Sequence, residues 1–154
     1  MKTKITLLIA VLFLSFNFSF AQNDEDMNLL SIFSEYAKAK NYEAAFSPWM
    51  ELRQKNPKFN RAIYTYGEKI LDHKIDNSSG AEQVTFIKDL VKLWEERAVH
   101  FASKTPKGTY MAKSCQLQYD YRKELSMSDL QLFKCFDEAY KTDAKTFTNP
   151  KALY

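Results

Sequence analysis

Apolar side chains recur at intervals of three and four residues through most of this chain, and this periodicity limits its fold more than any other feature. The interval places the apolar side chains on one side of an α-helix. The chain of 154 residues contains only three glycines and four prolines, too few for the many tight turns of a sandwich or barrel. Aromatic residues make up 15% of the chain, which excludes a disordered or glycine-rich protein. The sequence therefore predicts an all-α fold.

Six amphipathic segments follow one another along the chain. The first two are so close together that they must fold back antiparallel. Asn41 is a good N-cap for the second segment, and Pro48 inside this segment predicts a bend. Ser126, with Asp129 three residues later, has the spacing of a capping box and predicts the start of the sixth helix. The predicted helices cover about residues 27–40, 41–57, 63–75, 81–101, 109–123 and 126–140.

The first 21 residues have the pattern of a secretory signal peptide, with a basic start, an apolar run and a Ser19-Phe20-Ala21 cleavage site. The apolar run from Ile5 to Phe16 is shorter than the ~20 residues that span a bilayer. We therefore expect cleavage near Ala21 and a periplasmic or extracellular protein. Residues 22–26 are predicted to form a polar leader, and residues 27–154 the folded domain, with no membrane span in the mature chain.

The predicted mature chain is almost neutral. Cleavage removes Lys2 and Lys4 and leaves 20 basic and 19 acidic side chains, a net charge of +1. Such a protein has no general field that attracts nucleic acid or an anionic membrane. Cys115 and Cys135 are 20 residues apart. A disulfide between neighbouring helices and two separate buried thiols are both open, because geometry decides between them.

No group of residues in the sequence points to catalysis or metal binding. His73 and His100 are 27 residues apart without a neighbouring His or Cys, so we interpret them as solvent-facing side chains rather than ligands. Glu95 and Glu96 are adjacent, and adjacent side chains on a helix point about 100° apart. No glycine-rich phosphate loop, G-x-S-x-G or H-E-x-x-H motif is present. The sequence predicts a protein that is not an enzyme and has no cofactor or metal.

The segments from Met27 to Ile70 resemble the tetratricopeptide repeat, a 34-residue helical hairpin with the pattern W-x2-L-G-x2-Y, then A-x3-F, then P. In that pattern small residues mark the closest helix approach, and Tyr36 and Trp49 would fill the gaps between hairpins. Phe33 departs from it, because the repeat has a small residue there. The residues that carry the resemblance are Leu29, Ile32, Phe33, Tyr36, Ala45, Trp49 and Pro57, followed after 34 residues by Ile63, Tyr66, Gly67 and Ile70.

The resemblance implies about three antiparallel hairpins stacked as a short TPR-like α-solenoid, similar to exported repeat proteins of Gram-negative bacteria. An apparent seventh helix is cut short at Tyr154, which is typical of an incomplete array. In such arrays the first helix of each hairpin lines a concave face that binds peptides or partner helices. The resemblance therefore implies a non-catalytic scaffold for an unidentified protein or peptide, with candidate contacts at Ser34, Lys38, Arg61, Tyr64, Glu68, Lys113 and Gln116. A small-molecule module walled by aromatic side chains and a structural fragment of a longer repeat protein are the alternatives.

Overall fold

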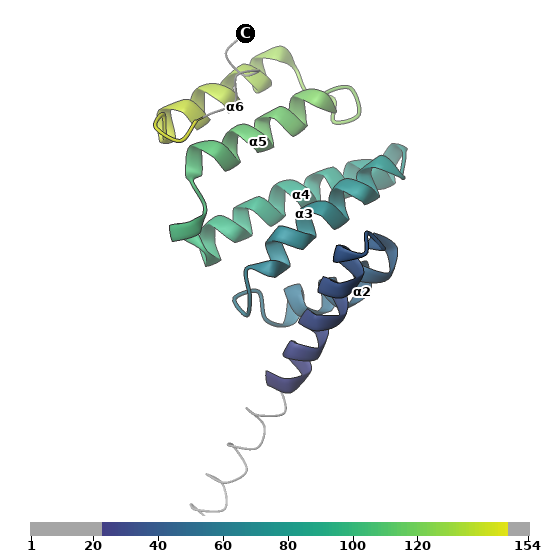
Figure 1. Ribbon diagram of the computed structural model, residues 1–154. Helices are drawn as coiled ribbons and strands as arrows, with labels where there is room; N and C mark the ends of the chain where they lie inside the picture. Colours follow the sequence, from purple (N-terminus) through teal and green to yellow (C-terminus); the bar gives the residue numbers. More distant parts are fainter. Residues whose placement is uncertain (1–22, 148–154) are drawn as a thin grey trace, which may run out of the picture. The chain divides into compact units, whose positions relative to one another are not determined.

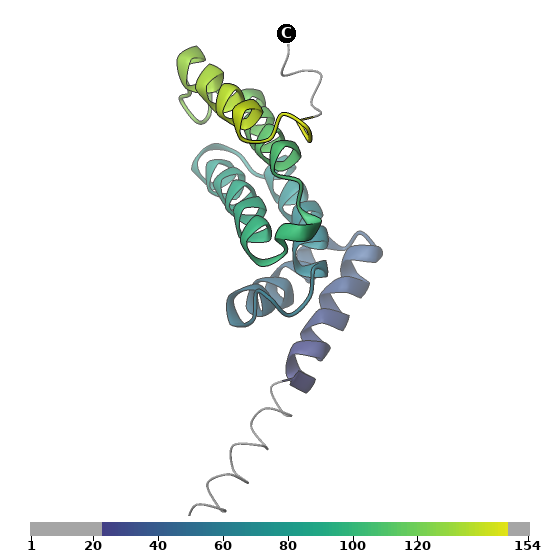
Figure 2. The same ribbon diagram turned by 90° about the vertical axis from the view of Figure 1, so that its left-hand side faces the viewer.

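The computed structural model describes residues 23–147, and every regular element in this part of the chain is helical (Figures 1 and 2). The all-α prediction is therefore confirmed. Residues 23–38 form the first described helix. It is followed by α2 (Tyr42–Lys55), α3 (Ala62–Asp76), α4 (Gly80–His100), a 3-10 turn (Ala102–Lys104), α5 (Lys107–Asp120) and α6 (Asp129–Thr142).

Some sequence predictions concern segments beyond this part of the chain. The signal peptide at residues 1–21, its cleavage site and the apparent seventh helix at residues 151–154 all lie outside the described residues. Among the residues that the structure does describe, no helix combines the length and the apolar character that crossing a membrane requires.

The chain divides into two compact units, Met1–Asn60 and Arg61–Tyr154. In the first unit, residues 23–38 and α2 form a hairpin. Lys55, the last residue of α2, forms ion pairs with Glu25 and, at 3.1 Å, with Asp26. The Asn56 amide also donates to the Asp26 carboxylate at 2.9 Å. These contacts join the beginning of one helix to the end of the next, so the two helices are antiparallel, as predicted.

The segment predicted to be a polar leader differs from that expectation in its described part. Residues 23–26 are helical, and Asp26 is only 1% exposed. A buried carboxylate is stable only when it is paired, and here Lys55 and Asn56 supply the partners. Residues 22–26 contain no apolar side chain, so hydrophobic periodicity had no signal to detect there.

The repeat-like residues of the first unit form its core only in part. Phe33, Ala45 and Trp49 are fully buried, whereas Tyr36 keeps 41% of its surface exposed. Trp49 is thus covered, as a gap-filling residue must be, and Tyr36 is not. The Asn41 side chain accepts a hydrogen bond from the backbone N–H of Ala44, which confirms the predicted N-cap.

Pro48 lies inside α2, and the helix runs without interruption from Tyr42 to Lys55. The predicted bend at Pro48 stays a prediction.

The second unit consists of two antiparallel hairpins, and α4 packs against both α3 and α5. The Gln83 amide at the start of α4 donates to the carbonyl of Ile75 at the end of α3 at 2.9 Å. At the opposite end, the Tyr64 ring lies 5.6 Å from the Phe101 ring. The core consists mainly of branched and aromatic side chains from α3 and α4, namely Ile63, Tyr64, Ile70, Leu71, Ile75, Ile87, Leu90, Leu93 and Trp94.

The second hairpin of this unit closes through a glycine at the start of α5. The Gly108 N–H donates to the Thr146 hydroxyl at 3.0 Å, and the Thr109 hydroxyl donates to the Thr146 carbonyl at 2.6 Å. A Cβ atom at Gly108 would lie 2.2 Å from the Asp143 carbonyl oxygen. The turn after α6 can therefore approach α5 this closely only because residue 108 has no side chain.

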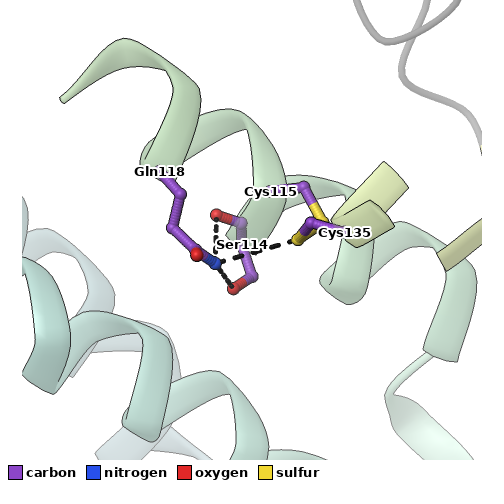
Figure 3. Close-up of a disulfide and its surroundings, with 4 residues drawn as sticks. All are labelled: Ser114, Cys115, Gln118 and Cys135. Atoms are coloured by element: carbon purple, nitrogen blue, oxygen red, sulfur yellow. Dashed lines mark hydrogen bonds between the residues drawn. A yellow bond between two sulfur atoms is a disulfide. The ribbon is translucent and has the colours of Figure 1, made fainter. Parts of the chain in front are cut away.

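A disulfide joins Cys115 in α5 to Cys135 in α6, with Cα atoms 5.7 Å apart (Figure 3). The structure thus decides for the disulfide over two separate thiols. The Gln118 amide donates to the carbonyl and hydroxyl of Ser114 and approaches the Cys135 sulfur at 3.9 Å.

The sixth helix begins later than predicted, because the predicted cap is wrong. Ser128, not Ser126, is the N-cap of α6: its hydroxyl accepts from the Gln131 N–H at 3.3 Å, and its own N–H donates to the Gln131 side chain at 2.8 Å. Ser126 has φ +53° and lies in the preceding turn. A serine followed after three residues by a polar residue occurs twice in this stretch, and the spacing alone does not distinguish the two.

We expect removal of the disulfide by Cys115→Ser with Cys135→Ser to lower the free energy of unfolding by about 3 kcal/mol, because the closed loop of about 20 residues gains freedom in the unfolded chain. Urea unfolding of the oxidised protein and the double variant measures this difference. The oxidised protein with dithiothreitol should match the double variant. Equal stability of the oxidised and reduced proteins would contradict this account.

We expect Ser128→Ala to lower the free energy of unfolding by about 1 kcal/mol, the usual value of a helix cap. Ser126→Ala is the matched control and should leave stability unchanged within about 0.5 kcal/mol. Thermal unfolding followed by circular dichroism compares the two variants, and a larger loss from Ser126→Ala would reverse the assignment of the cap.

Candidate functional site

An ion pair joins α3 to α5, the first helices of the two hairpins in the second unit. The Lys113 Nζ atom on α5 lies 2.7 Å from Glu68 Oε1 on α3. The same ammonium group lies 5.3 Å from the ring centre of Tyr110 and 5.9 Å from that of Trp94. Both distances are within the range of a cation–π interaction. Lys113 therefore connects α3, α4 and α5 through a single charged group.

Beside this ion pair, α3 carries a row of carboxylates. Glu68, Asp72 and Asp76 follow one another at four-residue spacing, which places them on the same side of the helix. Partial burial, together with the smaller effects of the charges of Glu68 and Asp76, raises the pKa of Asp72 to about 6, while Lys113 opposes the change. Although Asp72 retains an exposed surface, desolvation is the largest cause of its pKa change.

The end of α5 adds one further carboxylate, that of Asp120, to this surface. The Gln116 amide donates to the Asp120 carboxylate at 2.8 Å. Burial raises the pKa of Tyr121, and the charges of Asp76 and Asp120 raise it further. The pKa of Tyr121, the C-cap residue of α5, therefore depends on carboxylates from both α3 and α5. We refer to Glu68, Asp72, Asp76 and Asp120 as the acidic face.

Of the seven candidate contact residues, Glu68, Lys113 and Gln116 lie at this surface. Arg61 is exposed at the N-cap position of α3 and makes no side-chain cap hydrogen bond. Lys38, which belongs to the first unit, is exposed and pairs with Glu35 at 2.7 Å.

Two candidate contact residues are buried and cannot serve as surface contacts. Ser34 is 9% exposed and Tyr64 1% exposed. The Tyr64 ring packs edge-on against Phe101, so it belongs to the core. Tyrosine has an apolar ring and a polar end, and the sequence pattern does not show which of the two environments it occupies.

A cleft of about 560 Å³ lies between α4, α5 and α6. This volume is within the range of small-molecule sites. The disulfide forms part of its wall, together with the rings of Trp94 and Tyr110. Its remaining lining residues are Val91, Glu95, Ala98, Lys107, Met111, Ser114, Gln118, Glu138 and Thr142. Sequence reasoning missed this cleft because its lining comes from three helices and has no linear motif.

The two histidines do not form a metal site with their neighbours. Across residues 23–147, no group of three or more His, Cys, Asp or Glu side chains is arranged to hold a metal ion. His73 lies 3.2 Å from the Asn77 amide. His100 is not fully solvent-facing as predicted, because its Nδ1 atom is buried.

Comparisons with protein-family models, curated proteins and solved structures find no match. The resemblance to tetratricopeptide repeats therefore stays a hypothesis from the sequence.

We expect Asp72→Asn to stabilise the protein at pH 7.5 by up to about 1 kcal/mol, a value reduced for solvent screening of a partly exposed group. The folded protein binds the Asp72 proton more tightly than the unfolded chain does. The protonated carboxyl therefore stabilises the wild-type protein, and this contribution is lost as the pH rises from about 4 to about 6. Below about pH 4 the carboxyl is protonated in both states, and the advantage of the variant should disappear.

Urea unfolding at several pH values measures the difference between the Asp72→Asn variant and the wild-type protein. Glu51→Gln, an exposed position on α2, is the control and should show no such pH dependence. A stability gain for Asp72→Asn that is the same at all pH values would contradict the role of the carboxylate charge.

Proposed function

We propose that this chain is a non-catalytic, exported protein with a short TPR-like arrangement, and that it binds a basic segment of a partner protein on the acidic face. The Glu68–Lys113 ion pair carries this proposal. It joins two residues that the repeat resemblance implies as contacts, one from the first helix of each hairpin in the second unit.

The charges of this surface favour a cationic partner. Three carboxylates follow each other along α3, and the pKa of Asp72 is raised to about 6. A lysine or arginine placed beside Asp72 would relieve the repulsion among these carboxylates and stabilise the ionised form. An acidic partner segment would increase the repulsion instead.

The Glu68–Lys113 ion pair also limits where a basic residue of the partner would bind on the acidic face. Lys113 neutralises Glu68 and is held over two aromatic rings. The carboxylates that follow, Asp72 and Asp76, have no lysine or arginine ion pair of 4 Å or less in the described chain. A basic residue of the partner would therefore be placed one or two helical turns away from Lys113.

We expect short fluorescent peptides with alternating lysine and leucine to bind more tightly than matched peptides with glutamate in place of lysine. The double variant Asp72→Asn with Asp76→Asn should weaken binding of the basic peptide by about tenfold, since each lost charge contact contributes a fraction of a kcal/mol to about 1 kcal/mol. Fluorescence anisotropy at about 50 mM and about 300 mM salt measures affinity and its screening.

Glu51→Gln with Glu82→Gln is the control, because it removes the same number of charges at exposed carboxylates that are not part of the acidic face, and it should bind like the wild-type protein. The proposal fails if basic and acidic peptides bind equally, or if the control weakens binding as much as the double variant on α3.

A further inference from the structure

The disulfide between α5 and α6 lies in the wall of an open cleft and not in the closed interior of the second unit. Cys115 and Cys135 both line the cleft of about 560 Å³ between α4, α5 and α6. The rate at which a disulfide exchanges with thiols depends on whether a thiol can reach one of its sulfur atoms. Access from the cleft therefore decides how this bond reacts in the folded protein.

The two cysteines differ in their exposure. Cys115 is 1% exposed, whereas Cys135 is partly exposed. Gln118 also lines the cleft, and its Nε2 atom donates to the Cys135 Sγ atom at 3.9 Å (Figure 3). The Cys135 sulfur thus lies beside a polar group of the cleft wall. Of the two cysteines, Cys135 is the one that combines exposure with a place in this wall, so it is the one that a thiol can reach.

The charges of the cleft favour some thiols over others. Glu138 follows Cys135 by three residues on α6, which places the two side chains on the same side of the helix. Glu95 from α4 lines the same cleft. Lys107 lines it too, but it is the first residue of α5, about two helical turns from Cys115. A thiol that carries an ammonium group is attracted by the nearby Glu138 carboxylate, and an anionic thiol is repelled.

We propose that this disulfide exchanges with external thiols in the folded protein, that Cys135 is the sulfur they attack, and that small aminothiols are the favoured class. The site would be a place of reversible modification by a thiol. It involves no residue of the acidic face, so this proposal and the proposed function can fail independently.

The exchange begins when the thiolate of an aminothiol attacks Cys135 Sγ. A bond forms between the incoming sulfur and Cys135, and the bond between Cys135 and Cys115 breaks. Its electron pair leaves with the Cys115 sulfur, which takes up a proton. A second aminothiol can then attack the incoming sulfur, so that the two aminothiols are oxidised to their symmetric disulfide and Cys135 is released as a thiol. Both products lack the covalent link between α5 and α6.

Brief reaction of the oxidised protein with cysteamine identifies the sulfur that is attacked. N-ethylmaleimide at mildly acidic pH stops the reaction and labels the thiol that has been released. Trypsin separates the two cysteines, because Lys123 and Lys134 lie between them, and mass spectrometry locates each group. We expect cysteamine on Cys135 and maleimide on Cys115 in at least about tenfold excess over the reverse. Equal attachment to both cysteines, or preferred attachment to Cys115, would overturn the assignment.

The dependence on urea shows whether the folded protein reacts. We expect the rate constant with cysteamine to change by less than about twofold at urea concentrations below the unfolding transition. If the bond were reached only after unfolding, the rate constant would instead rise exponentially with urea, since the free energy of unfolding falls linearly. Such a rise would overturn the proposal. Both measurements use the unaltered protein.

The preference for aminothiols is tested by the ratio of the rate constants for cysteamine and thioglycolate at equal thiolate concentration. Glu138→Gln should lower this ratio by about threefold, because one nearby charge is removed. Glu124→Gln is the matched control, since Glu124 is exposed and does not line the cleft, and it should leave the ratio unchanged. An unchanged ratio in Glu138→Gln, or an equal change in both variants, would overturn this preference.

Discussion

The burial of one apolar helix face against another within each antiparallel hairpin is the interaction on which the rest of this structure depends. Helices of 14 or 15 residues such as α2, α3, α5 and α6 are marginal by themselves in water. Each hairpin is closed at its ends by specific contacts, such as Lys55 with Asp26, Gln83 with Ile75, and Thr109 with Thr146. In α5 and α6 a disulfide adds a covalent link between the facing sides.

The surface proposed to bind a partner results from this packing. Its repulsive and partly desolvated charges make the folded state less stable. Antiparallel hairpins bring the first helices α3 and α5 close enough for Glu68 and Lys113 to pair. The same approach leaves Asp72 beside like charges and partly desolvated. On α4, Trp94 and Arg97 are buried, although not every nitrogen atom of their side chains has a hydrogen-bond partner in the part of the chain that the structure describes. Such unfavourable local arrangements persist because the stabilisation from the remaining core outweighs them.

The success of the sequence predictions differs with the kind of signal. Helix positions and the Asn41 cap were predictable because periodicity and capping act over a few residues. The cap of α6 was misplaced from Ser128 to Ser126, because the spacing is satisfied twice and only the backbone conformation separates the two. The repeat resemblance implies a surface contact at Tyr64, which belongs to the core. The resemblance implies Glu68 and Lys113 as separate contact residues, but the sequence does not predict that the two side chains meet across 45 residues.

The sequence by itself determined the all-helical class, since the interval between apolar residues and the scarcity of glycine and proline are properties of the chain alone. Only the tertiary structure decided that Cys115 and Cys135 are bonded, that Asp26 is buried, and that Arg97 forms no ion pair with an acidic side chain of residues 23–147. Each of these depends on which residues distant in the chain come within a few ångströms of each other. Local pattern limits what a segment can form, whereas pairing, burial and charge are set by its neighbours in space.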